Sequence, residues 1–163
     1  HVDALRALKV LLQTHPRARL WIVGDGAYEP EVRRFVAEQG LGDSVKFLGF
    51  RRDVRQVIQC FDAQIFPSHQ EGTPNTLYEA MLAGVPPAAS TADGQGEILE
   101  HEKTALLFEP GDHATLAKHL ARLLDDPALR QRLGAAVRAR IADFDGRRCI
   151  QKMEQTYTRL LGG

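Results

Sequence analysis

The chain has 163 residues, of which 44% are hydrophobic and 26% charged, and its 21 basic and 21 acidic side chains cancel. This length and apolar content predict one folded domain, because burial can offset the loss of chain entropy. Zero net charge gives no electrostatic case for nucleic acid as a partner. No apolar run reaches the ~18 residues of a spanning helix, so we expect no transmembrane segment. Two cysteines without metal-ligand spacing predict a cytoplasmic protein with no metal site.

Short apolar runs alternate with stretches of helical periodicity. We expect five strands, at residues 20–23, 45–48, 63–66, 87–90 and 104–108. The first, Leu20-Trp21-Ile22-Val23, is continuously apolar, as in a strand buried on both faces. Alternating strands and helices predict the α/β class, with a doubly wound parallel sheet. Ligands bind such sheets beyond the carboxyl ends of the strands.

After Asp112 the sequence predicts helices alone, and the last of them carries Met153 and Tyr157. Their four-residue spacing favours packing in the core over contact with a ligand. Cys60 lies on an apolar helix face and is interpreted as a small core residue. Glu97 is interpreted as a residue that orders the loop around it.

The densest chemical signal is residues 67–80, which read Pro-Ser-His-Gln-Glu-Gly-Thr-Pro-Asn-Thr-Leu-Tyr-Glu-Ala. Thr73 is a favourable N-cap for a helix that ends at Gly84, and Pro74 suits the first helical position. Three backbone amides then point toward the preceding loop, those of Asn75, Thr76 and Leu77. With the helix dipole, these amides favour a bound anion such as a diphosphate.

Two carboxylates flank this helix start. Glu71 lies in the loop, and Glu79 lies six residues past Thr73, which is ~9 Å along the helix axis. An extended ligand with its phosphates at the helix start can therefore meet both glutamates. Ionised carboxylates accept hydrogen bonds from neighbouring hydroxyls, so the spacing predicts a nucleotide sugar, with the sugar at one glutamate and the ribose at the other.

Glu71 and Glu79 resemble the E-x7-E motif of retaining glycosyltransferases of family 4, also called group 1. Other segments resemble the family in the right order: residues 20–26 its "L-x-I-V-G-x-G", 45–50 its "V-x-F-x-G", 79–86 its "E-A-M-A-x-G-x-P", 93–98 its Gly-Gly…Glu loop, and 104–112 its "T-G-L-L-x-x-P-G-D". The resemblance extends over essentially the whole chain.

This resemblance implies the C-terminal, donor-binding half of a two-domain GT-B fold. Glu71 is then the catalytic residue that contacts the transferred sugar, and Glu79 holds the ribose hydroxyls. The remaining donor contacts that it implies are Gly72, Thr73, Asn75, Thr76 and Leu77 at the diphosphate, Phe50 and Arg51 at the base, and Gly24 and Gly26 where the backbone passes close to the ligand. His69 and Gly94 are candidates for contact with the sugar.

The reaction implied is a front-face displacement that retains the anomeric configuration and uses no metal or cofactor. In the family, a first strand with an Arg and a Lys-Gly pair precedes the position of His1, and an acceptor-binding N-terminal half precedes that strand. We therefore expect weak donor binding and no transfer by this chain alone. The acceptor, a glycan or glycolipid such as a growing surface polysaccharide, is expected to bind the N-terminal half, through which the protein can also dock at a membrane.

Other functions remain open at this point. A non-catalytic module that binds a nucleotide sugar would use the same cleft, and epimerases of GT-B architecture fit the two-glutamate helix less well. A dinucleotide-dependent oxidoreductase is disfavoured, because Gly24-Asp25-Gly26 is followed by Glu29 where that fingerprint has its third glycine.

Overall fold

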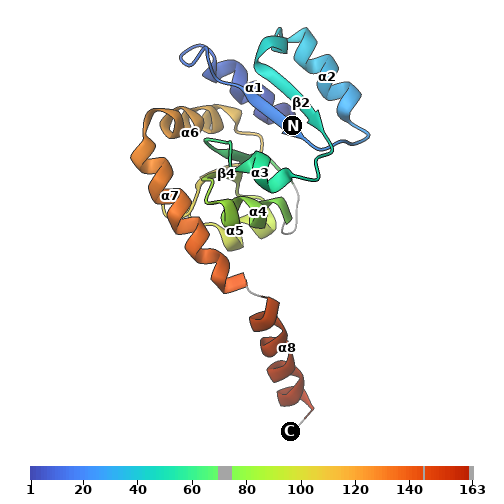
Figure 1. Cartoon of the computed structure of the whole chain (residues 1–163), viewed down its shortest axis with the longest axis vertical. Helices are drawn as coiled ribbons and strands as arrows, with labels where there is room; N and C mark the ends of the chain where they lie inside the picture. The colour runs from blue at the N-terminus through green and yellow to red at the C-terminus, as the bar shows by residue number, and fades with distance from the viewer. Residues whose placement is uncertain (70–74, 145, 162–163) are drawn as a thin grey trace.

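The computed structural model describes residues 1–69, 75–144 and 146–161 (Figure 1). In chain order the elements are α1 (Val2–Leu11), β1 (Leu20–Val23), α2 (Glu29–Glu38), the 3-10 turn η1 (Gly42–Ser44), β2 (Val45–Gly49), α3 (Val54–Ile58), β3 (Gln64–Phe66), α4 (Asn75–Ala83), β4 (Pro87–Ser90), α5 (Asp93–Ile98), β5 (Leu106–Phe108), α6 (His113–Asp125), α7 (Pro127–Arg140), η2 (Ile141–Phe144) and α8 (Gly146–Leu160).

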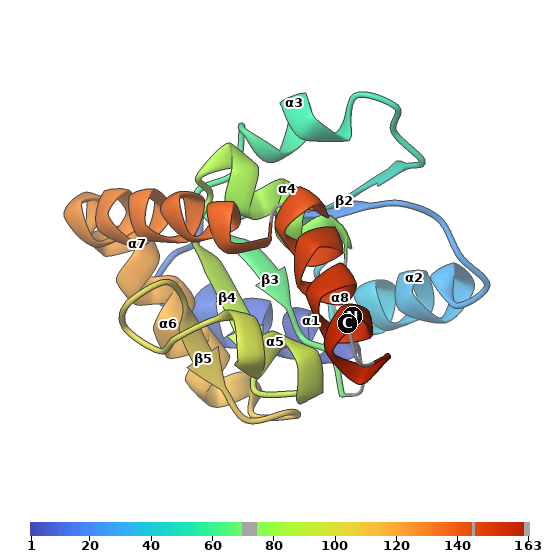
Figure 2. The ribbon, with the colours of Figure 1, turned by 90° about the horizontal axis from the view of Figure 1, so that it is seen from below.

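All strand pairings are parallel, as the alternation of strands and helices predicts. β1 pairs with β2, and β4 lies between β3 and β5, so the described strands fall into two sheets. Helices cover both faces: Figure 2 shows α3 and α4 on one side of β3 and α1 on the other. The α/β class is therefore confirmed.

The core has a layer on each face of the larger sheet. Ala88 of β4 packs with the α1 and α6 side chains Leu11 and Leu116, whereas Ala89 packs with Leu77 of α4. Successive side chains of a strand point to opposite faces, which explains this alternation. α1 also contributes Leu5 to a third cluster with α2, so it belongs to the cores of both sheets.

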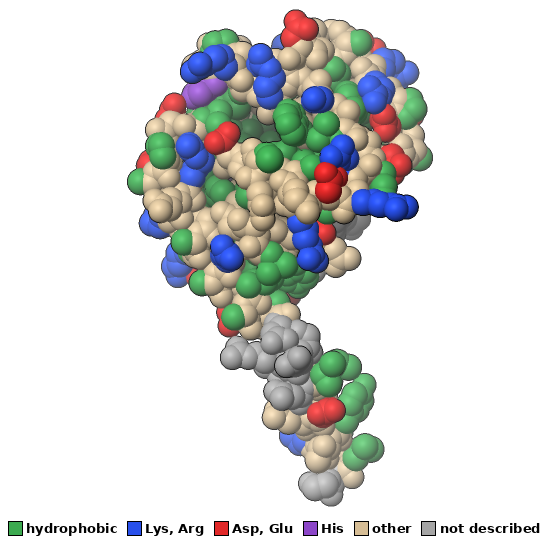
Figure 3. Space-filling model, in the orientation of Figure 1, with side chains coloured by type: hydrophobic (Ala, Val, Ile, Leu, Met, Phe, Trp, Pro, Cys, Tyr) green, Lys and Arg blue, Asp and Glu red, His purple; other side chains and the backbone are tan. Residues whose placement is uncertain are grey.

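Three expectations about burial are wrong. The β1 strand is only partly buried, with Trp21 40% exposed, because β1 pairs with a strand on one edge alone within the described residues. Cys60 is exposed because it lies in the turn beyond the end of α3. Met153 and Tyr157 are 57% and 59% exposed, because α8 extends away from the rest of the chain (Figures 1 and 3).

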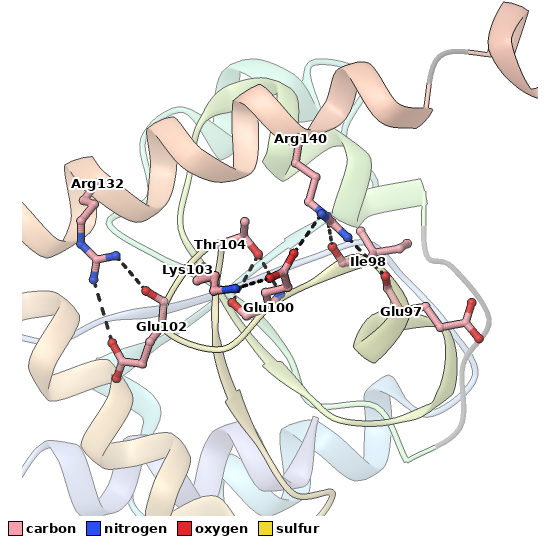
Figure 4. Close-up of polar contacts among 8 residues, drawn as sticks. All are labelled: Glu97, Ile98, Glu100, Glu102, Lys103, Thr104, Arg132 and Arg140. Atoms are coloured by element: carbon pink, nitrogen blue, oxygen red, sulfur yellow. Dashed lines mark hydrogen bonds and ion pairs between the residues drawn. The ribbon is translucent and has the colours of Figure 1, made fainter.

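Residues 93–98 form the helix α5 where the sequence analysis expects a loop. Two glycines lower the helix propensity of this segment, so tertiary contacts have to hold it. Arg140 of α7 supplies them: its guanidinium donates to the backbone carbonyls of Ile98 and Glu97 and to the Glu100 carboxylate (Figure 4). The Glu97 side chain points away from Arg140, so its carboxylate takes no part in the contacts that Arg140 makes here.

The fifth strand is shorter than expected and begins at Leu106. Thr104 and Ala105, which precede it, belong to a turn built on Glu100. The Thr104 hydroxyl accepts a hydrogen bond from the Glu100 amide at 2.8 Å, and the Thr104 amide donates to the Glu100 carbonyl at 2.9 Å. Because this turn uses the backbone of Thr104, it ends the strand pairing there.

Asp112 is the N-cap of α6, and its carboxylate accepts a hydrogen bond from the Thr115 amide at 2.9 Å. Hydrogen bonds from the Thr115 side chain and from its backbone amide hold the pKa of Asp112 below its ordinary value. We expect Asp112→Ala to lower the free energy of unfolding by about 1 kcal/mol and Asp112→Asn to lower it by much less, because asparagine also caps well. Urea unfolding of both variants checks this, and an equal loss in the two would contradict it.

His119 of α6 is buried and hydrogen-bonds the Leu107 carbonyl at 3.0 Å. Burial lowers the pKa of His119 below its ordinary value of 6.5, and the Leu107 bond opposes that shift only in part. Well above pH 6.5 the histidine is neutral in both states, so its contribution to stability is complete there. As the pH falls through 6.5 the unfolded chain binds the proton first, and stability is lost until the pH passes the lowered pKa.

We therefore expect the melting temperature to fall between about pH 7.5 and pH 5.5, and to fall less in His119→Gln. The matched control is His113→Gln on the same helix. Thermal unfolding in a pH series checks this. A pH dependence that is the same in wild type and His119→Gln would overturn it.

Candidate functional site

The carboxyl ends of neighbouring strands are tied together by short hydrogen bonds. The Gly24 amide, just after β1, donates to the carbonyl of Gly49 at the end of β2 over 2.8 Å. The hydroxyl of Ser90, at the end of β4, donates to the Ser68 carbonyl just after β3 over 2.6 Å. Within each sheet, the loops that follow the carboxyl ends of the strands, where a ligand is expected, therefore lie together at one edge.

His69 contacts the beginning of α1 at this edge. Its Nε2 lies 2.7 Å from the Asp3 carboxylate, which is buried, whereas His69 is exposed. Gly111, which follows β5, lies next to the imidazole ring of His69. A Cβ atom added to Gly111 would be 3.7 Å from the Cε1 atom of that ring. Asp3 was not among the predicted site residues. In the sequence, Asp3 is notable only as an acidic residue in the first turn of a helix, and acidic residues are common at that position.

α4 begins at Asn75, so the helix expected here is confirmed over the described residues. Asn75 and Thr76 are exposed, whereas the Leu77 side chain is fully buried and leaves only its amide for a ligand. The first four amides of a helix have no acceptor inside it. Glu79, half-buried, lies one turn further along α4. The predicted residues Glu71, Gly72, Thr73 and Pro74 lie outside the described residues.

Phe50 and Arg51 follow β2 at the same edge as Gly24. Phe50 is 71% exposed, so its ring is available to a flat ligand. The Arg51 guanidinium donates twice to the Asp53 carboxylate, at 2.8 and 2.6 Å. This pairing raises the pKa of Arg51 and lowers the pKa of Asp53, so both stay charged at neutral pH. Arg51 would have to leave Asp53 to contact a ligand.

The three glycines predicted to lie at the ligand, Gly24, Gly26 and Gly94, differ in conformation and exposure. Gly24 has a φ of +115°, a conformation that other residues rarely adopt, and a Cβ on Gly24 or Gly26 would meet nothing within 4 Å. The backbone after β1 is thus open to a ligand. Gly94 lies on α5, which follows β4, and is half-buried.

The described residues contain no group of three or more His, Cys, Asp or Glu side chains placed to hold a metal ion. In the part of the chain that the structure describes, no helix is long and apolar enough to cross a membrane. What the site brings together is an open strand edge, a helix start and the half-buried Glu79.

Residues 1–140 match the family model described as "Glycosyl transferases group 1". The chain belongs to this family. Among its relatives, the lipopolysaccharide core biosynthesis glycosyltransferase LpsD of Rhizobium meliloti is 37% identical over 131 residues, which are 80% of this chain and 37% of LpsD. A glycogen synthase of Mycobacterium tuberculosis is 32% identical over 158 residues, 95% of this chain and 38% of the synthase.

The fold of this group 1 chain also matches solved structures. Anabaena HepE in complex with UDP superposes with a TM-score of 0.89 at 28% identity, over 98% of this chain and 45% of HepE. HepE has also been solved with UDP-glucose, with a TM-score of 0.87 to this chain. The group 1 chain thus spans less than half the length of these relatives, and its fold is that of the GT-B glycosyltransferases.

Proposed function

We propose that the chain binds a nucleoside diphosphate sugar and forms the donor side of a retaining glycosyltransferase of family 4. The observation that carries the proposal is the exposed start of α4, with Glu79 one turn further on, at the carboxyl edge of parallel strands. HepE, which is similar over nearly the whole chain, was solved with UDP and with UDP-glucose, and this supports a uridine donor.

In this proposal the diphosphate lies at the backbone amides of Asn75, Thr76 and Leu77, where the helix dipole favours negative charge. Glu79 accepts hydrogen bonds from the ribose hydroxyls, and Phe50 lies against the base. Glu71 contacts the transferred sugar. Arg51 has to leave Asp53 before it can contact the donor.

The proposed reaction is a front-face displacement, with the nucleotide sugar as substrate and no cofactor. The bond from the anomeric carbon to the diphosphate oxygen breaks, the acceptor oxygen bonds to that carbon, and the departing diphosphate takes the acceptor proton. The protein contributes by positioning the donor and by stabilising the negative charge of the leaving group. The acceptor, a glycan or glycolipid, binds the part of the protein outside this sequence, in the cytoplasm or at its membrane surface.

The test is transfer of labelled glucose from UDP-glucose to a glycan acceptor by the full polypeptide. We expect turnover in wild type and a fall in kcat of at least about 100-fold in Glu71→Gln, since a charged contact to the reacting sugar is lost. Glu97→Gln, an exposed glutamate on α5, is the matched control and keeps its kcat. Selective binding of UDP-glucose without transfer in wild type would instead identify a non-catalytic binding module.

A further inference from the structure

A buried carboxylate of α1 contacts an exposed histidine at the carboxyl edge of the strands. Asp3 is only 7% exposed, and its Oδ2 lies 2.7 Å from Nε2 of His69, whose side chain is 67% exposed. The other oxygen of Asp3, Oδ1, lies 3.6 Å from the Arg6 guanidinium, which is too long for a hydrogen bond. Within the described residues, His69 is therefore the hydrogen-bond partner of the Asp3 carboxylate. A buried carboxylate destabilises the fold unless it is paired, so breaking this bond is costly.

Contacts from three elements hold His69 in place. The carbonyl of Ser68, the preceding residue, accepts a hydrogen bond from the Ser90 hydroxyl at 2.6 Å, which ties this backbone to the end of β4. Gly111 lies next to the ring after β5, and Asp3 contacts Nε2 from α1. An exposed side chain loses entropy when it is confined to one rotamer, and these contacts offset that loss. The imidazole is therefore already positioned before a ligand arrives.

The contact with Asp3 determines which nitrogen of His69 carries the proton. An ionised carboxylate only accepts hydrogen bonds, so Nε2 is the donor and carries the hydrogen. In the neutral ring, Nδ1 then has a lone pair and no proton. Nδ1 has no hydrogen-bond partner among residues 1–69, 75–144 and 146–161, and the ring is largely exposed. His69 therefore presents one hydrogen-bond acceptor to a ligand at this edge.

A sugar hydroxyl is the ligand group that suits this acceptor. The bridging and terminal oxygens of a nucleotide sugar's diphosphate carry no proton at neutral pH, so they cannot donate to a neutral Nδ1. A hydroxyl donates one hydrogen bond and keeps lone pairs for other contacts. His69 follows β3, and the next helix in the described chain is α4, at whose start the diphosphate is proposed to bind. The sugar attached to that diphosphate carries hydroxyls of this kind.

We propose that Asp3 is a positioning residue for sugar transfer, which holds the His69 ring so that Nδ1 accepts a hydrogen bond from a hydroxyl of the transferred sugar. This inference rests on the proposed function, because it takes the donor to bind at the start of α4. Asp3 itself does not touch the donor. Loss of Asp3 therefore weakens binding of the nucleotide sugar and leaves binding of the nucleoside diphosphate unchanged. A residue that only stabilises the fold would affect both ligands equally.

Calorimetric titration of the full polypeptide with UDP-glucose and with UDP tests this difference. We expect His69→Ala to bind UDP-glucose about tenfold more weakly, which is the effect of about one hydrogen bond, and to bind UDP as wild type does. Asp3→Ala is expected to show most of the same selective loss. The double variant is expected to lose no more than His69→Ala, because Asp3 acts only through His69.

The matched control is Asp125→Ala. Asp125, at the end of α6, lies 3.0 Å from Nε2 of His15, which follows the other end of α1. This is a second Asp–His pair on the same helix, away from the carboxyl edge of the strands. Asp125→Ala is expected to change the affinity for neither ligand.

Nitrogen NMR of the His69 ring, assigned by its absence from His69→Ala, gives a readout that a purely structural role of Asp3 would not produce. At about pH 8, where an ordinary histidine is neutral, we expect the chemical shift of a protonated nitrogen at Nε2 and of an unprotonated one at Nδ1. Addition of UDP-glucose is expected to shift the Nδ1 signal, whereas addition of UDP is not.

Equal losses of UDP and UDP-glucose affinity in Asp3→Ala and His69→Ala would overturn the inference, as would unchanged binding of both ligands. A proton on Nδ1 in wild type would also overturn it. If Asp3→Ala does not fold, His69→Ala and the wild-type spectrum still decide, because the His69 side chain is exposed and its removal leaves the core intact. Failure of wild type to bind either ligand would overturn the proposed function, and the inference with it.

Discussion

Replacing Gly134 by alanine is expected to lower the free energy of unfolding by about 3 kcal/mol. Gly134 lies in α7 where this helix crosses the end of α4, and a Cβ there would overlap the carbonyl oxygen of Gly84. Gly84 has a φ of +70° and ends α4, so its carbonyl cannot turn aside without strain. The two helices would have to separate, and the contacts of Val137 with the α4 side chains would be lost.

Gly42→Ala is the matched control, because a Cβ at Gly42 meets nothing within 4 Å and its φ is not in the left-handed region. Its expected effect is within about 0.5 kcal/mol. Equilibrium unfolding in urea measures both variants. Equal stability of Gly134→Ala and Gly42→Ala would show that α4 and α7 are not in close contact.

Replacing Glu79 by alanine is expected to weaken UDP binding by about 100-fold, since hydrogen bonds to a charged group contribute about 1.5–3 kcal/mol each. Glu79 is half-buried on α4, one turn past Asn75, and in the proposed site its carboxylate accepts hydrogen bonds from the ribose hydroxyls. Calorimetric titration of the full polypeptide with UDP measures this loss.

Glu97→Ala is the control for that titration, because Glu97 is exposed on α5 and points away from Arg140. It should bind UDP as wild type does. Both variants should melt close to the wild-type temperature, which separates loss of binding from loss of fold. A change in UDP affinity of less than about threefold in Glu79→Ala would remove the ribose role from this residue.

The strands and most helices could be predicted because their signals are local. Continuous apolar runs such as residues 20–23 and glycines such as Gly84 mark elements whose ends depend on a few neighbouring residues. α5 could not be predicted in this way. It contains two glycines in six residues and is held by Arg140, more than forty residues away in the sequence.

Burial was predicted less well than secondary structure, because it depends on what lies opposite each face. The apolar stripe on α8 is real, yet Met153 and Tyr157 are exposed because α8 extends beyond the body of the chain. Likewise, Leu20–Val23 has the composition of a fully covered strand although β1 is only partly buried and pairs with β2 alone within the described residues. The sequence alone shows which face of a helix or strand is apolar, but it does not show which other element, if any, covers that face.

Part of the candidate site was within reach of the sequence. The helix over Asn75–Ala83 and the turn after Gly24 follow from local periodicity and strand ends, whereas the predicted cap Thr73 lies outside the described residues. The contact between His69 and Asp3 joins residues 66 positions apart, and nothing in either local sequence indicates it. Residue 71 lies outside the described residues, so its catalytic role stays a prediction.

We propose above all that this chain provides the donor site for a nucleoside diphosphate sugar. Parallel calorimetric titrations of the full polypeptide with UDP and with NADH test it most directly, with Glu79→Ala titrated alongside. We predict that UDP binds to wild type, that Glu79→Ala loses most of this affinity, and that NADH does not bind. Binding of NADH that is unchanged in Glu79→Ala, with no binding of UDP, would contradict the account.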